Sequence, residues 1–228
     1  MPVNMFELPQ PAIVIANSEE RFPVRRIYCV GRNYGAHARE MGHDPDREPP
    51  FWFAKPADAI VPNGSVIDYP PRTENLHHEI ELVVAIDKAG TNVAVSDALD
   101  HVFGYAAGID LTRRDLQKEA KNQGRPWVTA KGFDQSAPVS VLHTVADIGH
   151  PGAGRIWLSV NDEIRQQGDL NELIWSVAEA IAELSTLFSL SPGDLIFTGT
   201  PAGVGPVVAG DQIIGGIDGI DEIKITIK

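Results

Sequence analysis

The chain has 228 residues, 43% of them hydrophobic and 22% charged, which is ordinary for a globular protein with a single main domain. Nineteen lysine and arginine residues against 31 aspartate and glutamate residues give a formal net charge of −12. This charge repels nucleic acids and anionic membranes, so an anionic substrate would need a locally positive pocket. A single cysteine, Cys29, and the absence of a signal-like start or a long apolar stretch predict a cytoplasmic protein without a disulfide.

Glycine and proline are frequent, with 21 and 17 residues, and their spacing indicates many short elements joined by turns. We expect residues 1–24 to form a short N-terminal appendage, with an edge strand in the apolar run 12–16, and residues 25–228 to form the main domain. In that domain, apolar runs and alternating patterns predict six strands, at Ile27–Val30, Ile80–Ile86, Val102–Ile109, Arg155–Val160, Asp194–Thr198 and Glu222–Ile227.

Two helices are predicted from their capping signals. The segment Thr112–Gln123 begins with a T-x-x-D pattern and stops before a glycine. The segment Ser176–Leu190 begins with an S-x-x-E capping box and places apolar side chains along one face. Because strands outnumber helices, the pattern predicts a mixed, strand-rich α+β fold.

The segment from Asn33 to Pro50 is polar, is interrupted by glycine and proline, and has no sustained apolar period. Such segments are often lids or disordered loops, and we expect a lid at about residues 33–50. Within it, His37 and Glu40 are three residues apart, so a helical turn would bring their side chains together. A carboxylate beside an imidazole is the usual arrangement of a general base, although surface His–Glu pairs have the same spacing.

Glu79 and Glu81 flank an isoleucine at the start of a long apolar run, and Asp110 ends another such run. Residues two apart on a strand point to the same face, so the two glutamates would share one side. Buried like charges are costly unless a cation lies between them. Three carboxylates at strand ends would suit Mg²⁺ or Mn²⁺. The alternative is that the glutamates lie on a solvated edge and Asp110 lies in an ordinary turn.

Lys55 and Lys131 follow apolar stretches, and each is either a surface lysine or a ligand for an anion. The glycine-rich run from Thr198 to Pro206 lacks the lysine of a phosphate-binding loop. It is either a series of tight turns or a place where the backbone approaches a small ligand. Cys29 has no electropositive surroundings that would activate a thiol, so we expect it in the core.

These motifs occur together in one order along the chain, as Gly31-Arg32-Asn33-Tyr34 with His37 and Glu40, Phe53-x-Lys55-Pro56, His77-His78-Glu79-Ile80-Glu81, Gly108-Ile109-Asp110 with Arg114-Asp115 and Gln117, Lys131-x-Phe133, and Gly193-Asp194 before Thr198-Gly199-Thr200-Pro201-x-Gly203-Val204-Gly205. In this order they resemble the fumarylacetoacetate hydrolase family, and specifically its short acylpyruvase and fumarylpyruvate hydrolase members. The resemblance covers about residues 25–228. It implies a strand-rich roll of mixed sheets with peripheral helices, assembled as a homodimer.

The resemblance also implies roles for individual residues. Glu79, Glu81 and Asp110 match the metal ligands of the family, which usually bind Mg²⁺ or Mn²⁺. His37 and Glu40 match a catalytic dyad on a lid that orders over bound ligand. The remaining matches all contact substrate in the family, and they are the catalytic Lys131 together with Gln117, Arg32, Arg114 and Thr200.

The implied activity is hydrolysis of a carbon–carbon bond in a 2,4-diketo acid, most specifically of fumarylpyruvate to fumarate and pyruvate in aromatic (gentisate) catabolism. His37 would accept a proton from water, and Lys131 with Gln117 would stabilise the oxyanion formed at the 4-keto carbon. The same metal–enolate chemistry would serve an acylpyruvase, an oxaloacetate decarboxylase or an isomerase of an unsaturated dicarboxylate. A non-catalytic ligand-binding module is the remaining alternative, and the complete set of matching residues counts against it.

Overall fold

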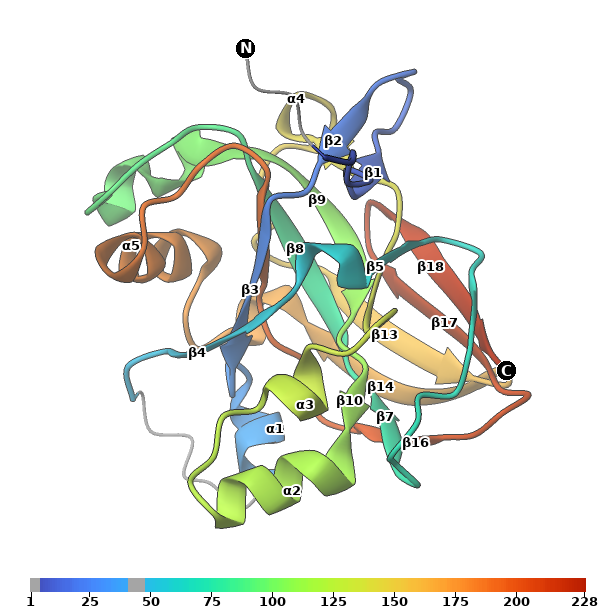
Figure 1. Cartoon of the computed structure of the whole chain (residues 1–228). Coiled ribbons are helices and arrows are strands. Elements are labelled where there is room, and N and C mark those ends of the chain that lie inside the picture. The colour runs from blue at the N-terminus through green and yellow to red at the C-terminus, as the bar shows by residue number, and fades with distance from the viewer. Residues whose placement is uncertain (1–4, 41–47) are drawn as a thin grey trace.

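The computed structural model describes residues 5–40 and 48–228. Most strands of this part belong to two sheets that pack face to face (Figure 1). The larger sheet has eight strands, in the order β4 (Phe51–Lys55), β3 (Arg26–Gly31), β15 (Asp194–Phe197), β8 (Ile80–Ile86), β9 (Val102–Ile109), β11 (Ala137–Val139) and β5 (Ile60–Pro62), with β12 (His143–Thr144) beside β9. The second sheet has five, in the order β14 (Glu163–Asp169), β13 (Arg155–Val160), β17 (Gln212–Ile217), β18 (Ile220–Ile227) and β6 (Val66–Ile67).

Smaller elements surround the two sheets (Figure 1). A three-stranded ribbon consists of β10 (Thr112–Arg113), β7 (Leu76–His78) and β16 (Gly205–Val207), and a hairpin consists of β1 (Ala12–Val14) and β2 (Arg21–Pro23). The α-helices are α1 (Gly35–Glu40), α2 (Arg114–Asn122), α3 (Val128–Lys131), α4 (Val145–Ile148) and α5 (Val177–Leu187). The 3-10 helices are η1 (Ala57–Ala59), η2 (Val95–His101) and η3 (Leu170–Glu172). Among the described residues, no helix is both long enough and apolar enough to cross a bilayer.

Strand β8 is buried along its whole length because both faces of the larger sheet are covered. Its side chains alternate between two apolar clusters. Leu82 and Val84 belong to the core between the two sheets, whereas Val83 and Ala85 belong to a second core beneath the β1–β2 hairpin. Burial on both faces therefore explains why β8 appears in the sequence as a continuous apolar run rather than an alternating one.

The outer face of the larger sheet is covered by different elements at its two ends. The hairpin covers one end, and α1, α2 and α3 gather at the opposite end, at the bottom of Figure 1. Glu81 precedes Val83 by two residues and therefore points to this outer face, toward the helices. The same sheet face thus provides apolar packing at one end and charged side chains at the other.

The structure confirms the predicted strands, with ends that differ by one or two residues. The predicted capping box is present at the start of α5, where Ser176 and Glu179 each accept a hydrogen bond from the other's backbone N–H. The first 24 residues include the predicted strand, as β1, and the division at residue 24 stays a prediction. Part of the predicted lid, residues 41–47, lies outside the described residues, and its lid function stays a prediction.

The predicted T-x-x-D cap at the start of α2 is wrong. Helix α2 begins at Arg114, and the residue before it makes no side-chain capping bond. Thr112 instead donates its hydroxyl to Glu79 Oε1 at 3.2 Å, and Asp115 accepts a hydrogen bond from Thr73 at 2.6 Å. Both side chains are used in contacts with distant parts of the chain, and these outcompete the local cap.

Candidate active site

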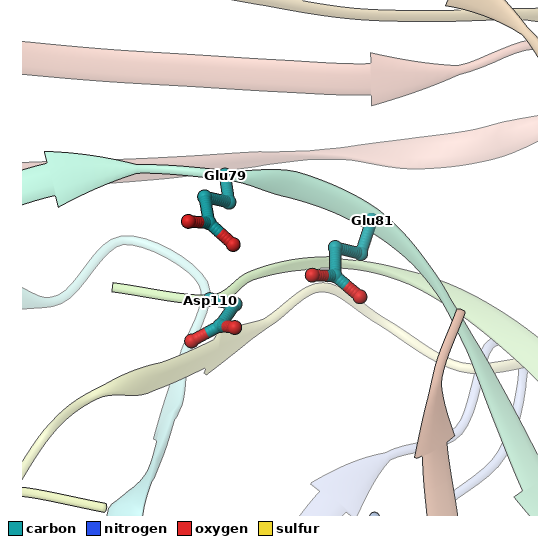
Figure 2. Close-up of side chains that lie close together, drawn as sticks. All are labelled: Glu79, Glu81 and Asp110. Carbon is teal, nitrogen blue, oxygen red and sulfur yellow. The ribbon is translucent and has the colours of Figure 1, made fainter. Parts of the chain in front are cut away.

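Three carboxylates meet at the helix-covered end of the larger sheet. Glu79 and Glu81 extend to the same side from the start of β8, and Asp110 approaches them from the end of β9 (Figure 2). The pairing of β8 with β9 sets Glu81 opposite Gly108, two residues before Asp110. One oxygen from each carboxylate lies within 4.8 Å of the others, and all three residues are buried. The alternative of a solvated edge is therefore wrong.

Three cationic side chains balance these carboxylates. Lys131 Nζ lies 2.8 Å from Glu79 Oε2 and 2.5 Å from Asp110 Oδ2. Lys55 Nζ lies 2.8 Å from Asp110 Oδ1, and the Arg114 guanidinium donates to Glu79 Oε1. Both lysines are buried, so neither is a surface residue. Each binds an anion, as the second alternative predicted, and that anion is a carboxylate of the protein itself. The cost of burying three like charges is thereby offset.

The two glutamates differ in their protonation behaviour. Burial opposes ionisation of both, but Lys131 and Arg114 outweigh it at Glu79 and hold its pKa below the ordinary value. At Glu81, burial and the neighbouring carboxylates of Asp110 and Glu79 raise the pKa well above the ordinary value. Burial also opposes the charge on Lys131, but Asp110 and Glu79 raise its pKa and keep it protonated.

The carboxylate triad fits a hard divalent cation. Glu81 makes no ion pair within the described residues, and its carboxylate accepts one hydrogen bond, from the Gly199 N–H at 2.6 Å. Within the same described residues, Asp110 Oδ1 accepts no hydrogen bond of good geometry, although the Lys55 ammonium group lies beside it. Carboxylate oxygens are the ligands that Mg²⁺ and Mn²⁺ prefer. Glu79, Glu81 and Asp110 can therefore bind such a metal.

Helix α1 brings the predicted histidine–glutamate pair together. His37 Nδ1 lies 3.2 Å from Glu40 Oε2, and the Glu40 carboxylate also accepts the Gly203 N–H at 3.1 and 3.2 Å. His37 is 7% exposed, so the pair differs from an ordinary surface contact. With Nδ1 held by a carboxylate, the neutral ring carries its lone pair on Nε2, as a base requires.

A cavity of about 40 Å³, here called the inner cavity, gathers most of the predicted site residues. Its lining includes Arg32, His37, Glu79, Glu81, Arg114, Gln117, Lys131 and Thr200. Asp110 and Glu40 are not part of the lining, because Asp110 is completely buried and Glu40 lies behind His37. Sequence reasoning therefore selected residues that the fold does bring to one place, while their individual roles stay predictions.

Two residues of the inner cavity have distinctive local geometry. Arg114 Nη1 donates to Gln117 Oε1 at 2.6 Å, so the amide nitrogen of Gln117 is the atom left to donate to a ligand. Arg32 has a φ of +60°, in the left-handed region that residues with a Cβ rarely adopt. Such strained residues cluster at functional sites.

The glycine-rich run includes both tight turns and close backbone approaches. Gly203 has a φ of +95°, and a Cβ there would lie 2.1 Å from the carbonyl oxygen of Arg165. Gly199 has a φ of +99°, and a Cβ there would lie 2.8 Å from the Asn33 Cβ. Gly199 and Thr200 also line the inner cavity, which places the backbone of this run at the site.

Sequence reasoning missed Gln166, a completely buried residue that supports the site from β14. Its side-chain oxygen accepts hydrogen bonds from His78 Nδ1 at 2.9 Å and the Ile80 N–H at 3.1 Å. Its amide nitrogen donates to Thr200 Oγ1 at 2.8 Å and the Pro201 carbonyl at 2.9 Å. Gln166 thus joins the start of β8 to the glycine-rich run. No sequence signal marks it, because its strand is otherwise mostly exposed and polar.

Comparisons with known proteins agree with this geometry. The family described as "Fumarylacetoacetate (FAA) hydrolase C-terminal" matches residues 26–228. The fumarylpyruvate hydrolase of Ralstonia sp. is 47% identical over 189 residues, which cover 82% of this chain and 98% of that protein. The mitochondrial oxaloacetate tautomerase FAHD1 of Mus musculus is 44% identical over 204 residues, covering 90% and 92%.

Among solved structures, the fumarylpyruvate hydrolase from Pseudomonas aeruginosa, crystallised in complex with Mn²⁺ and pyruvate, has a TM-score of 0.97 to this chain. It is 51% identical, and the match covers 99% of both chains. The shared fold, the match over nearly the whole chain and the buried triad beside a histidine–glutamate pair lead to one conclusion. The chain belongs to the fumarylacetoacetate hydrolase family.

Proposed function

We propose that this chain is a metal-dependent hydrolase that cleaves the carbon–carbon bond of a 2,4-diketo acid, with fumarylpyruvate as substrate and fumarate and pyruvate as products. One observation carries the proposal: the buried His37, paired with Glu40, lines the same cavity as Glu79 and Glu81 of the carboxylate triad. Hydrolysis needs an activated water beside a site for an anionic substrate, and this arrangement can provide both. The two related fumarylpyruvate hydrolases, one of them solved with Mn²⁺ and pyruvate, support the choice of substrate.

Glu79, Glu81 and Asp110 would hold Mg²⁺ or Mn²⁺. When bound, the divalent cation supplies a Lewis acid that stabilises negative charge on the oxygens of the diketo acid. The neighbouring cations Lys131 and Lys55 form ion pairs with Asp110 and hold it in place as a ligand. The net charge of −12 makes a locally compensated site of this kind necessary for an anionic substrate.

His37 Nε2 accepts a proton from water, which then adds to the 4-keto carbon. Glu40 orients the ring through Nδ1 and stabilises the protonated imidazole, and the Gly203 N–H fixes the position of Glu40. General-base catalysis of this type contributes about 10²–10⁴-fold to the rate. The bond between the 4-keto carbon and the adjacent methylene carbon then breaks, and the released pyruvate enolate takes up a proton.

Lys131 and Gln117 stabilise the oxygen that becomes negative when water adds. Lys131 stays protonated because Asp110 and Glu79 raise its pKa above the ordinary value, although burial opposes its charge. Gln117 presents its amide nitrogen because Arg114 occupies its carbonyl oxygen. Donors fixed in advance within an enclosed cavity are more effective than donors in water. Arg32 and Thr200, which line the same cavity, contact the remaining oxygens of the substrate.

A second candidate is a reaction of oxaloacetate through its enolate. The relative from Mus musculus, 44% identical, is an oxaloacetate tautomerase, which favours this alternative. Tautomerisation and decarboxylation of oxaloacetate both need the triad and the cationic cavity, but neither needs an attacking water. Activity that survives the loss of His37 would therefore identify an enolate reaction rather than hydrolysis.

The proposal has three finer points. The single cysteine supports action in the cytoplasm, and the family resemblance supports a role in the breakdown of aromatic compounds and assembly as a homodimer of 24.7-kDa chains. Sedimentation velocity at micromolar concentration tests the last point. A single boundary at the mass of one chain would contradict it.

The decisive experiment is a panel of substrates assayed with Mg²⁺ and with chelator. The panel contains fumarylpyruvate, acetylpyruvate, maleylpyruvate, fumarylacetoacetate and oxaloacetate. We expect the highest kcat/KM for fumarylpyruvate, stoichiometric release of fumarate and pyruvate, and loss of turnover with chelator. Turnover of oxaloacetate alone, or of no diketo acid at all, would reject the hydrolase assignment.

A further inference from the structure

Helix α2 carries four polar side chains along one face. Arg114, Gln117, Lys118 and Lys121 recur at the spacing that puts residues on the same side of a helix. Arg114, Gln117 and Lys121 line the inner cavity, and all four line a second cavity of about 350 Å³, here called the outer cavity. One helix face therefore forms a wall that both cavities share.

The two cavities differ in size, so different parts of a substrate would occupy each of them. The inner cavity, about 40 Å³, has room for only a few water molecules. A diketo acid with a four-carbon acyl group exceeds that space, so the acyl group must extend beyond the inner cavity. Arg114 and Gln117 line both cavities, so the outer cavity adjoins the inner cavity at these residues. Glu40 of the predicted dyad also lines the outer cavity. Its larger volume accommodates an acyl chain along α2.

Cations gather where the two cavities meet. Burial lowers the pKa of Lys121, and the nearby Arg32 and Arg114 guanidinium groups lower it further. Arg114 is already engaged by Glu79 and Gln117. Arg32 makes no hydrogen bond or ion pair within residues 5–40 and 48–228, and its backbone is held in the left-handed region. Like charges placed this close are stabilised when an anion binds among them.

We propose that the outer cavity is the acyl-group subsite and that Lys121, with Lys118 at its exposed side, binds a carboxylate at the far end of the acyl group. This assignment rests on the proposed function and deepens it. It makes Lys121 a specificity-determining residue that favours diketo acids whose acyl group ends in a carboxylate. Diketo acids with a short, neutral acyl group reach the inner cavity but gain nothing from Lys121.

The test compares fumarylpyruvate, whose acyl group ends in a carboxylate, with acetylpyruvate, whose acyl group ends in a methyl group. The Lys121→Gln variant should lower kcat/KM for fumarylpyruvate by about 10–100-fold, the range expected for losing one charged hydrogen bond. It should lower kcat/KM for acetylpyruvate by less than about 3-fold, since that substrate has no such bond to lose. Lys121→Arg, which retains the charge, should recover most of the preference.

Arg125→Gln is the matched control. Arg125 lies just beyond α2, is paired with Glu119 at 3.6 Å on the exposed surface, and lines neither cavity. The Arg125→Gln variant, like Lys121→Gln, removes one positive charge from this region. Its kinetics with both substrates should match those of the wild type. A change of preference in this variant would attribute the effect to the general field of the protein and overturn the assignment of Lys121.

Product inhibition gives a second readout. Fumarate should inhibit acetylpyruvate hydrolysis by the wild type, and its inhibition constant should rise at least about 10-fold in Lys121→Gln while that of oxalate stays unchanged. If Lys121→Gln fails to fold, Lys118→Gln should show the same selective loss to a smaller extent. Equal losses on both diketo acids would reject the subsite while hydrolysis stands. Failure of the wild type to cleave either diketo acid would reject the proposed function itself.

Discussion

Lys55 Nζ lies 2.8 Å from Asp110 Oδ1, and neither side chain has any contact with solvent. Lys55 also donates to the backbone carbonyl oxygens of Leu111 and Lys131. Through these contacts one buried ammonium group ties β4 to the residue that follows β9 and to the end of α3. Removing one partner of a buried ion pair leaves the other charge uncompensated, which is more costly than the pair itself is worth.

The Lys55→Met variant should therefore lower the free energy of unfolding by about 3–5 kcal/mol. Urea denaturation followed by tryptophan fluorescence measures this. Lys88→Met, at an exposed position, is the control and should change stability by less than about 0.5 kcal/mol. The double variant Lys55→Met/Asp110→Asn should be more stable than Lys55→Met alone. A single variant as stable as the wild type would show that Asp110 does not depend on this ammonium group.

The Glu81→Gln variant should lose metal binding while it keeps its fold. A neutral amide oxygen can still accept the Gly199 N–H, so the local structure is retained, but the negative charge needed by a divalent cation is gone. Titration of Mn²⁺ followed by electron paramagnetic resonance measures the affinity, and turnover should fall with it. Glu222→Gln, on the exposed side of β18, should bind Mn²⁺ normally. Wild-type affinity in Glu81→Gln would remove this residue from the ligand set.

The His37→Ala variant separates hydrolysis from decarboxylation at one site. Hydrolysis should slow by about 10²–10⁴-fold, because the general base is lost. Decarboxylation of oxaloacetate should slow much less, because the divalent cation that the carboxylate triad would hold, rather than the imidazole, would stabilise the negative charge that develops on the enolate. Both rates are measured on one preparation at saturating Mg²⁺, with pyruvate release as the readout. Equal losses would assign His37 to binding rather than to water activation.

The Gly203→Ala variant should impair the dyad through the backbone. The new Cβ would collide with the Arg165 carbonyl oxygen, so the N–H that holds Glu40 must move. A displacement of about 1 Å at a catalytic group lowers kcat by about 10²-fold. Gly210→Ala has the same positive φ but open space around its Cβ, so it tests backbone strain without the collision. Comparable kcat values for the two variants would exclude a role of Gly203 in holding Glu40.

The Asp115→Asn variant should show a stability loss that depends on pH. Burial opposes ionisation of Asp115, but hydrogen bonds from Thr73 and the Glu74 and Leu116 N–H groups outweigh it and lower its pKa. A lowered pKa stabilises the folded protein above the ordinary aspartate pKa, and this contribution disappears as pH falls through the folded-state value. Urea unfolding at pH 7 should therefore separate wild type from variant, and the difference should shrink toward pH 3. A difference independent of pH would exclude this charge as its cause.

The sequence could predict what depends on local pattern. Strands β8 and β9 are recognisable because both faces of their sheet are buried, which makes their apolar runs continuous. The shared side of Glu79 and Glu81 follows from strand geometry alone, and the contact of His37 with Glu40 follows from helical spacing.

What the sequence could not predict depends on contacts between distant segments. Gln166 stands 88 residues from His78 and 34 from Thr200, yet it joins both through one amide group. Thr112 has a good capping sequence, but a carboxylate 33 residues away takes its hydroxyl. The lysines Lys55 and Lys131 have ordinary surroundings in sequence, and only the folded sheet places them against Asp110.

The alternation of side chains along β8 determines what an error in its pairing with β9 would do to the folded protein. Glu79 and Glu81 face the site and the odd-numbered residues after them pack in the second core, whereas the even-numbered residues from Ile80 fill the core between the two sheets. A slip of one residue in the pairing with β9 would exchange the two sets, sending both carboxylates into the apolar interior. Chains with the shifted register would therefore be too unstable to persist. Only the correct pairing of β8 with β9 gives a folded protein, and that pairing also places the metal ligands.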